Sequence, residues 1–564
     1  MNATPAFPRQ HTWAAVGALV LAGIAVYANT LRVPFFFDDR LAILENPTIR
    51  DLSALGQVLS PPENGSGVAG RPLVNLSLAL NYAAGGTSVF GYHAVNLLLH
   101  LLTGLTLFGL VRRLLAAWQP AEPATGWALA VAGLWLVHPL QTETVTCVVQ
   151  RTEGMLGLFY LLSLYTAVRG ATSARPGRWY AAAIAAAFAG MATKEVMVTV
   201  PLVLFVLDRT FLAGSWKGAW QQRKGLYSGL AASWLLLGFL LFASGGNRGT
   251  AAGFGLGVTP WTYALTQCEA ITTYLGLALW PRTLVVDYGT DIVTRATQVI
   301  PQGLTVLVLV AATAVALRSR SLAGCFGAWF FIILSPSSSF VPLVTQTIAE
   351  HRMYLPLAAV TAGVAATLHA TLGRRGLFVC LALGVALGAR TVARNADYRS
   401  EVSILEATIA QRPANARAWN NLGNALARAG KTDEAQAALR TALRLKPDFA
   451  AAHTNLGNVF DLLQRWPESE VEMREAVRLE PNHTKARFNL GNVLLRVGKN
   501  AEAAENLREA VRLEPGDAEI RHNYAVALVL AGKSEEGFAE FRENLRRHPE
   551  YTRSRTALQQ LGGM

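Results

Sequence analysis

The chain has 564 residues, of which 52% are hydrophobic and only 15% are charged. This charge content is low for a soluble protein and the length exceeds one ordinary domain, so the composition predicts a membrane protein with a further domain attached. The net charge of +13 comes from basic residues in short loops between apolar runs, which indicates membrane topology and excludes a nucleic-acid surface. The four cysteines lie in apolar segments without CxxC spacing, which excludes a disulfide framework and a zinc site.

Apolar runs fill residues 1–395, and most approach the roughly 20 residues that a helix needs to cross hydrocarbon. The first run lacks the basic start and the small-x-small site of a cleavable signal peptide, so we expect a retained span. We expect this part to form an all-α, polytopic helical bundle. The runs lie at 13–31, 94–115, 126–140, 153–169, 179–193, 195–211, 227–243, 262–281, 299–317, 321–335, 352–371 and 375–393.

The basic loops predict the topology. If every run crosses the membrane, basic loops fall on both sides, against the positive-inside rule. Run 262–281 is the weakest span because it carries Gln267, Glu269 and several threonines. Without it, about eleven spans remain, the N-terminus and the basic loops are cytoplasmic, and the C-terminal part lies outside. Alanine and arginine usage favours a bacterial inner membrane with a periplasmic outer side; in a eukaryote the outer side is the endoplasmic reticulum lumen.

The segment FFFDDR, residues 35–40, follows the first run and places two adjacent carboxylates at the membrane boundary. Charge is costly there and is usually functional. Asp38 and Asp39 are therefore the candidates for a catalytic base, with only a slight preference for Asp38. The surrounding outer loop, 32–92, is long enough to hold short surface helices of its own, as a functional loop does.

Further charged residues share the outer face in the eleven-span topology. Cations at helix ends can act only as snorkelling anchors, but anchoring does not require the acidic residues beside them. Both signs on one face indicate a site that binds an anion and performs base chemistry. His138 has two interpretations, a helix-end cap or a catalytic group. The candidates for donor phosphate binding or site support are Arg71, His138, Glu143, Arg151, Glu153, Lys194, Glu195, Glu350, His351 and Arg352.

No group of these residues has convincing metal-ligand spacing, and cationic side chains can take the place of a metal at a phosphate. We therefore expect no obligatory metal or cofactor. The chain also lacks a P-loop, a GxGxxG motif after a strand and a GxSxG elbow, so nothing supports soluble nucleotide-sugar chemistry.

A 34-residue period begins near residue 396. Glycine recurs at Gly423, Gly457 and Gly491, and proline at Pro413, Pro447, Pro481, Pro515 and Pro549. This period is the signature of the tetratricopeptide repeat, in which small residues let two helices pack closely. We expect a repeat domain over 396–564, with repeats at about 416–449, 450–483, 484–517 and 518–551 and a flanking helix at each end.

The fourth repeat departs from the pattern, because Ala525 replaces the glycine and Asn544 a close-packing alanine. Such degradation is typical of a solenoid end. Asparagine occupies one position in all four repeats, at Asn421, Asn455, Asn489 and Asn523. A ladder of amides suits an extended peptide acceptor or partner; the alternative is a packing role between repeats.

Together these motifs resemble one family. An acidic pair after the first run, HPLQTETV at 138–145 followed by Arg151 and Glu153, the Lys194–Glu195 junction and the Arg352-x-Tyr-Leu-Pro segment are similar to transmembrane proteins with tetratricopeptide repeats. That family belongs to the C-type glycosyltransferase fold and is related to protein O-mannosyltransferases. The resemblance covers nearly the whole chain.

The resemblance implies a membrane glycosyltransferase that takes a hexose, such as mannose, from a polyprenyl-phosphate lipid and passes it to hydroxyl groups of exported proteins. Asp38 or Asp39 would accept the hydroxyl proton, and the cations would stabilise the departing phosphate. The repeats would hold the protein acceptor or a partner. The alternatives are transfer to surface polysaccharide or lipid, and a non-catalytic envelope scaffold.

Overall fold

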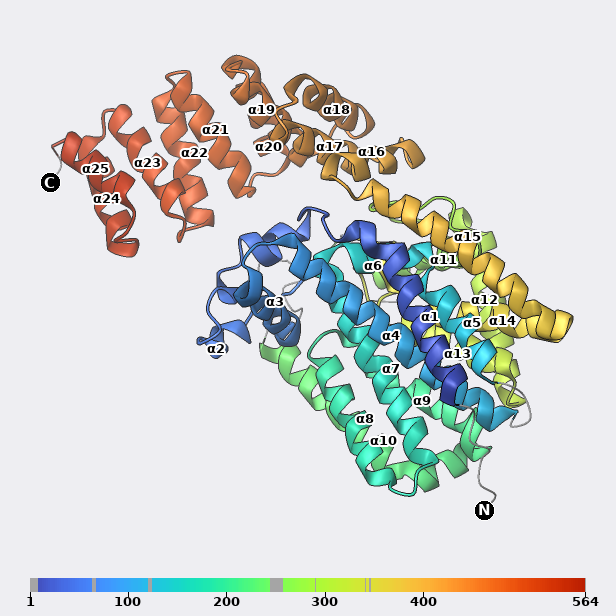
Figure 1. The fold of residues 1–564 in the computed structure, drawn as a ribbon. Coiled ribbons are helices and arrows are strands. Elements are labelled where there is room, and N and C mark those ends of the chain that lie inside the picture. The colour runs from blue at the N-terminus through green and yellow to red at the C-terminus, as the bar shows by residue number, and fades with distance from the viewer. Residues whose placement is uncertain are drawn as a thin grey trace. The chain divides into compact units, whose positions relative to one another are not determined.

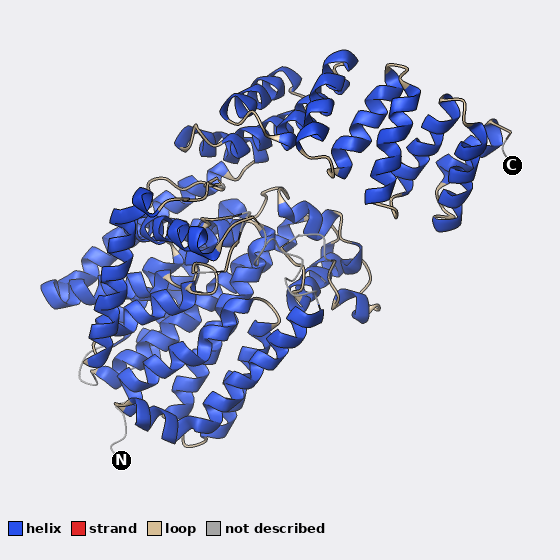
Figure 2. Cartoon of the chain, turned by 180° about the vertical axis from the view of Figure 1, so that it is seen from behind, coloured by secondary structure: helices blue, strands red, loops and turns tan. Residues whose placement is uncertain are grey.

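The computed structural model describes residues 9–62, 67–119, 124–243, 257–289, 291–339, 341–343 and 346–562. All regular elements in these ranges are helices, which confirms the all-α fold class (Figures 1 and 2). The contacts divide the chain after Ile404 into two units, which are described separately.

The first unit is a bundle of long helices. Each of the twelve apolar runs becomes helical, as the hydropathy pattern predicts. The helices are α1 (Arg9–Tyr27), α4 (Val89–Trp118), α5 (Ala124–Leu136), α7 (Arg151–Ala171), α8 (Pro176–Met191), α9 (Val200–Leu207), α10 (Trp216–Ala243), α11 (Pro260–Leu279), α12 (Ile300–Arg318), α13 (Leu322–Leu334), α14 (Leu357–Leu372) and α15 (Gly376–Asp397).

Seven of the described helical segments are long and apolar enough to cross a membrane, as expected of a multi-pass membrane protein. One of the seven, Leu357–Asp397, contains both α14 and α15, whereas α5 and α13 are apolar but shorter. Helix α11 is not among the seven, in keeping with its polar content. Because the seven are counted by length and composition alone, the expected eleven spans and their orientation stay predictions.

The loop after α1 is folded, as its length predicts. It contains two helices, α2 (Leu55–Val58) and α3 (Pro72–Gly85), and a small apolar core that also includes Val148 and Val149. Buried amides join its parts: Asn46 Nδ2 donates to Asn75 Oδ1 (2.9 Å), and Asn75 Nδ2 donates to the Val58 carbonyl (2.7 Å). Loop 32–92 is therefore a compact substructure with its own core, and it can hold side chains in fixed positions.

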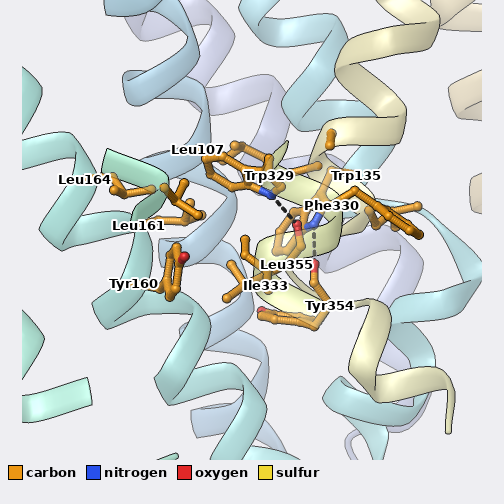
Figure 3. Packing of buried hydrophobic residues seen from close by; sticks show 14 of the residues in the cluster. Leu107, Trp135, Tyr160, Leu161, Leu164, Trp329, Phe330, Ile333, Tyr354 and Leu355 are labelled. Carbon is orange, nitrogen blue, oxygen red and sulfur yellow. Dashed lines mark hydrogen bonds between the residues drawn. The ribbon is translucent and has the colours of Figure 1, made fainter. Parts of the chain in front are cut away.

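Two tryptophans hold the turn before α14. Trp135 Nε1 donates to the Tyr354 carbonyl (2.7 Å), and Trp329 Nε1 donates to the next carbonyl, of Leu355 (3.0 Å) (Figure 3). Gly157 on α7 makes room, because a Cβ there would overlap the Tyr354 ring. These contacts hold in place the segment that begins with Glu350.

The second unit consists of helix pairs stacked in chain order (Figure 1). The first helices of the pairs begin 34 residues apart, and a Cβ on Gly423 or Gly491 would lie 2.5 Å from a leucine of the paired helix. This lack of room explains the recurring glycine. The helices are α16 (Glu401–Gln411), α17 (Ala416–Arg428), α18 (Thr432–Leu445), α19 (Ala450–Leu462), α20 (Trp466–Leu479), α21 (Thr484–Arg496), α22 (Asn500–Leu513), α23 (Ala518–Leu530), α24 (Ser534–Arg547) and α25 (Thr552–Gln560).

The fourth repeat is adapted, not degraded. Gly537 lies on the second helix of the repeat, where the other repeats have Ala or Ser. A Cβ on Gly537 would lie 2.9 Å from the Ala525 carbonyl. The glycine that permits close packing is therefore on the second helix in this repeat and on the first helix in the other three. Asn544 is buried and donates to the Ala518 carbonyl (2.8 Å) and to Ser554 Oγ (2.9 Å). Its amide thus joins the repeat to the closing helix α25.

The tryptophan contacts lead to a stability prediction. Trp329→Phe keeps an aromatic ring but leaves the buried Leu355 carbonyl without its donor, which costs about 1–3 kcal/mol. Thermal unfolding of the detergent-purified protein measures this loss. Trp261→Phe is the matched control, because Trp261 is 63% exposed. Equal melting temperatures for the two variants would refute the structural role of the indole N–H.

Candidate active site

The two aspartates of FFFDDR have different environments. Asp39 is buried, and its carboxylate accepts the backbone N–H groups of Val148 (3.3 Å) and Val149 (2.6 Å). Burial nevertheless raises the pKa of Asp39 to about 7, because desolvation outweighs these hydrogen bonds. Asp39 therefore fastens loop 32–92 to the segment after α5 that contains Val148 and Val149, and it has little access to a substrate.

Asp38 is the exposed member of the pair. The preceding residue, Phe37, has φ = 51°, in the left-handed region that a side chain disfavours. Strain of this kind costs about 1–3 kcal/mol and clusters at functional sites. The pKa of Asp38 is raised, chiefly by desolvation from the surrounding protein and by Glu143, while the charges of His351 and Arg71 oppose the shift. Asp38 thus combines access with an environment suited to a base.

A chain of buried polar groups lies beside Asp38. Glu143, on the short helix α6 (Thr142–Thr146), accepts the Nδ1–H of His351 (2.8 Å) and the backbone N–H of the same residue (3.1 Å). Burial alone would raise the pKa of Glu143, but His351 lowers it overall. His351 Nε2 lies 4.0 Å from Glu153, which forms an ion pair with Lys194. Four of the predicted residues therefore form one connected network.

Glu350 anchors a second segment next to this network. Its Oε1 accepts the backbone N–H of Val285 (2.6 Å) and the hydroxyl of Tyr288 (2.9 Å). Its Oε2 is buried without a hydrogen-bond partner among the described residues. Desolvation raises the pKa of Glu350 to about 7, although the charge of Arg394 opposes this. Glu350 is therefore a second titratable carboxyl close to the site.

Arg394 is a site residue that the sequence reading missed. It is 1% exposed, donates to Asp397 (3.1 Å) and lies over the Tyr398 ring at 5.2 Å. Its Nε and Nη2 have no hydrogen-bond partner in the described part of the chain, nor does the buried Tyr398 hydroxyl. The positive charge of Arg394 acts to lower the pKa of both Glu143 and Glu350. A buried cation with unused donors near carboxylates is suited to an anionic ligand.

Three of the predicted site residues, Arg151, His138 and Arg352, form hydrogen bonds that hold parts of the protein together. Arg151 is fully buried and donates to Asn96 Oδ1 (2.8 Å) and to the Ser77 and Tyr92 carbonyls (3.1 and 2.9 Å). These bonds use its guanidinium to hold loop 32–92 against α4 and α7, which favours site support over phosphate binding.

His138 and Arg352 also use their side-chain nitrogens for hydrogen bonds within the protein. His138 Nδ1 accepts the Leu140 N–H (3.2 Å), which supports the helix-cap interpretation, and its Nε2 bonds to the Ala278 carbonyl (3.1 Å). Arg352 donates to the carbonyls of Ser337 (3.3 Å), Thr347 (3.0 Å) and Gln346 and thereby holds the preceding segment.

The remaining candidates lie at the edge of the network. Arg71 is half-buried before α3, donates to the Gly67 carbonyl and acts electrostatically on Asp38. Glu195 is half-buried at the start of the 3₁₀ helix Glu195–Thr199, directly after Lys194. Within the described ranges, no group of three or more His, Cys, Asp or Glu residues could hold a metal ion.

The asparagine ladder lies in the repeat unit and joins successive repeats. Asn455 Nδ2 donates to Asn420 (2.9 Å), Asn489 Nδ2 to Asn458 (2.9 Å) and Asn523 Nδ2 to Asn492 (2.8 Å). Asn421 accepts from Asn420 (3.2 Å). These bonds favour the packing interpretation, because the Nδ2 groups of Asn455, Asn489 and Asn523 already donate to the preceding repeat. The residues are half-buried, so peptide contact through their oxygens stays a prediction.

Comparisons with known proteins support the sequence resemblance. Family models described as TPR repeat and tetratricopeptide repeat match residues 423–464, 488–552 and 404–437. The chain is 30% identical over 327 residues to protein O-mannosyl-transferase Tmtc1 of Drosophila melanogaster, covering 52% of this chain and 37% of the relative. It is 27% identical over 536 residues to TMTC2 of Mus musculus and 26% over 532 residues to TMTC2 of Homo sapiens, in each case covering 75% of this chain and 61% of the relative.

The chain therefore resembles protein O-mannosyl-transferases with tetratricopeptide repeats and spans 37 to 61% of the length of these relatives. Among solved structures, MamA is 18% identical with a TM-score of 0.25, covering 27% of this chain and 82% of that chain. YrrB, titled a TPR protein with an unusual peptide-binding site, is 22% identical with a TM-score of 0.26, covering 28% of this chain and 81% of that chain.

Asp39 leads to a pH prediction. Its pKa of about 7 in the folded protein exceeds the unfolded value of about 3.9, so the folded chain retains a proton that the unfolded chain releases. The stability contributed by this group is present below about pH 4 and is lost as the pH rises through about 7. Asp39→Asn should remove this part of the decline.

Thermal unfolding of detergent-purified protein between about pH 4 and pH 8 measures the effect. Asp433→Asn in the repeats is the matched control, because Asp433 is exposed. An Asp39→Asn variant with the pH profile of the wild type would show that Asp39 is not the group responsible.

Proposed function

We propose that the protein is a membrane O-mannosyltransferase that moves mannose from a polyprenyl-phosphate donor to serine or threonine hydroxyls of exported proteins. The observation that carries this proposal is the accessible carboxylate of Asp38, set among cations and acids by the buried hydrogen bonds of Asp39. The similarity to protein O-mannosyl-transferases supports mannose as the sugar.

Asp38 is the general base in this mechanism. The acceptor hydroxyl attacks the anomeric carbon, the bond from that carbon to the phosphate oxygen breaks, and Asp38 takes the hydroxyl proton. One displacement of this kind inverts the anomeric configuration. Because a hydroxyl is a weak nucleophile, a positioned base is necessary. The raised pKa of Asp38 brings its basicity closer to neutral pH.

Positive charge is needed where the lipid phosphate departs. Arg394 supplies it through its unused Nε and Nη2, and Arg71 adds charge beside Asp38. The pair of Lys194 and Glu153 and the bond between Glu143 and His351 hold the two loops around the reacting groups. In this assignment cationic side chains stabilise the leaving phosphate, and metal independence stays a prediction.

The repeats are the part suited to protein partners, since helical-repeat superhelices present extended binding surfaces. In this proposal they hold the acceptor protein or a partner on the outer side of the membrane. A bacterial chain would carry the site in the periplasm. Transfer to polysaccharide or lipid would give the same chemistry with a different labelled product.

Transfer of labelled mannose from synthetic polyprenyl-phosphate-mannose into a Ser/Thr peptide by the purified full chain tests the proposal. Asp38→Asn should lower kcat by about 100-fold or more, because the base is lost. Asp51→Asn, an exposed aspartate in the same loop, is the control and should be fully active. A folded Asp38→Asn variant with wild-type kcat would remove the assignment, and label found only in glycan or lipid would change the acceptor.

Arg394 has a separate test. Arg394→Lys keeps the charge but not the fork of donors, so we expect KM for the donor to rise about tenfold or more. Arg399→Lys is the matched control, because Arg399 lies five residues after Arg394 and is exposed. Donor KM measured at saturating peptide gives the comparison. An unchanged KM in Arg394→Lys would exclude a donor-phosphate contact.

A further inference from the structure

A cavity of about 310 Å³ opens between α4, α5, α13 and α14. This volume lies at the lower end of the range of about 300–1,000 Å³ that is usual for ligand pockets. A smaller cavity of about 50 Å³ adjoins it, because the two share lining residues. The shared residues are Val111, Leu114, Phe211, Phe326 and Ala362. We refer to the two together as the α14 cavity.

The α14 cavity lies at the end of the bundle opposite the candidate active site. Trp118 lines the cavity at the end of α4, whereas Asn96, which binds Arg151, lies 22 residues earlier on the same helix. At the helical rise this separation is about 33 Å along the axis. The cavity is therefore distinct from the site that carries out the proposed transfer.

The cavity exists because α14 places small side chains opposite large ones. The residues that line it from α14 are mostly alanines at three- and four-residue spacing, which puts them on one face. They are Ala358, Ala359, Ala362, Ala365, Ala366 and Ala370. The facing wall contains Trp118, Phe211 and Phe326. An empty space of this kind forfeits dispersion contacts, which an aliphatic chain would restore.

The mouth of the cavity holds a histidine with an unused nitrogen. His369 lines the cavity from the last turn of α14, and its ring lies edge-on to Trp127 at 4.9 Å. Its Nδ1 is buried without a hydrogen-bond partner among the described residues. Buried polar atoms are normally paired, so this nitrogen is suited to a polar group of a ligand.

Two arginines without partners flank the same mouth. Arg374 and Arg375 directly follow α14 and are exposed, and in the described part of the chain neither side chain forms a hydrogen bond or an ion pair. The next residue, Gly376, lies close to the cavity wall, because a Cβ on it would be 3.0 Å from the Trp127 ring. The mouth therefore has two positive charges available to an anion.

The order of these groups along α14 matches the order of groups in a phospholipid. Arg374 follows His369 by five residues, about 7.5 Å along the axis, and Ala358 precedes His369 by eleven residues, about 16 Å. Positive charge, a hydrogen-bonding group and an apolar wall thus succeed one another with depth. A phospholipid presents an anionic phosphate, ester carbonyls and acyl chains in the same sequence.

We infer that the α14 cavity binds a membrane phospholipid with an anionic headgroup. One acyl chain lies along the alanines of α14, an ester carbonyl accepts the Nδ1–H of His369, and the headgroup lies at Arg374 and Arg375. Basic residues at the ends of membrane helices bind anionic headgroups in this way. The inference goes beyond the proposed function and does not depend on it.

The test uses phosphatidylglycerol with a photoactivatable diazirine on one acyl chain. The full chain is reconstituted in phosphatidylcholine nanodiscs that contain this probe, and cross-linked peptides are mapped by mass spectrometry. We expect cross-links to residues of α4 and α14 that line the cavity, such as Leu114 and Ala362. The double variant Arg374→Gln/Arg375→Gln, which removes the charge, and Ala366→Trp, which fills the cavity, should each lower cross-linking about tenfold or more.

Each variant has a matched control. Arg175→Gln/Arg178→Gln removes two exposed arginines that do not line the cavity, and Thr367→Trp enlarges an exposed residue of α14 beside Ala366 that does not line it either. Both controls should cross-link like the wild type.

Three results would overturn the inference. The first is equal cross-linking of the wild type and the Arg374→Gln/Arg375→Gln variant, whose exposed positions make unfolding an unsuitable explanation. The second is equal labelling of the cavity by a phosphatidylcholine probe, which would show that the headgroup charge has no role. The third is stronger competition by polyprenyl phosphate than by unlabelled phosphatidylglycerol, which would assign the cavity to the sugar donor.

Discussion

The candidate active site depends on the carboxylate of Asp39 and the two backbone N–H groups it binds. Val148 and Val149 lie about 110 residues further along the chain, so these bonds join loop 32–92 to the segment that follows α6. Asp39 is buried, whereas Asp38, which follows the left-handed Phe37, is exposed. One aspartate holds the loops and the other is left available for chemistry.

Most of the buried carboxylates near Asp38 are compensated by specific partners. Glu143, Glu153 and Glu350 each have a hydrogen-bond or ion-pair partner, as buried carboxylates require. By contrast, Glu350 Oε2 and the Nε and Nη2 of Arg394 have no hydrogen-bond partner among the described residues. A buried cation without full compensation is costly, and an anionic substrate would satisfy it. In the proposed mechanism the lipid phosphate does so.

Features that depend on local sequence patterns could be predicted. The twelve apolar helices and the 34-residue repeat follow from hydropathy and periodicity alone. The division of labour between Asp38 and Asp39 could not be predicted, because it depends on backbone groups distant in the chain. Arg394 was missed because an arginine at the end of an apolar run has the pattern of a membrane anchor. The choice between phosphate binding and site support for Arg151 could not be predicted, because its carbonyl partners, such as Tyr92, have no signature in the sequence.

An experimental structure of the protein with an acceptor peptide and a non-transferable donor analogue tests the central assignment most directly. We expect the acceptor hydroxyl within about 2.6–3.2 Å of an Asp38 carboxylate oxygen, with Asp39 still bound to Val148 and Val149. A hydroxyl bound instead by Asp39 or Glu350, with Asp38 turned to solvent, would contradict the assignment.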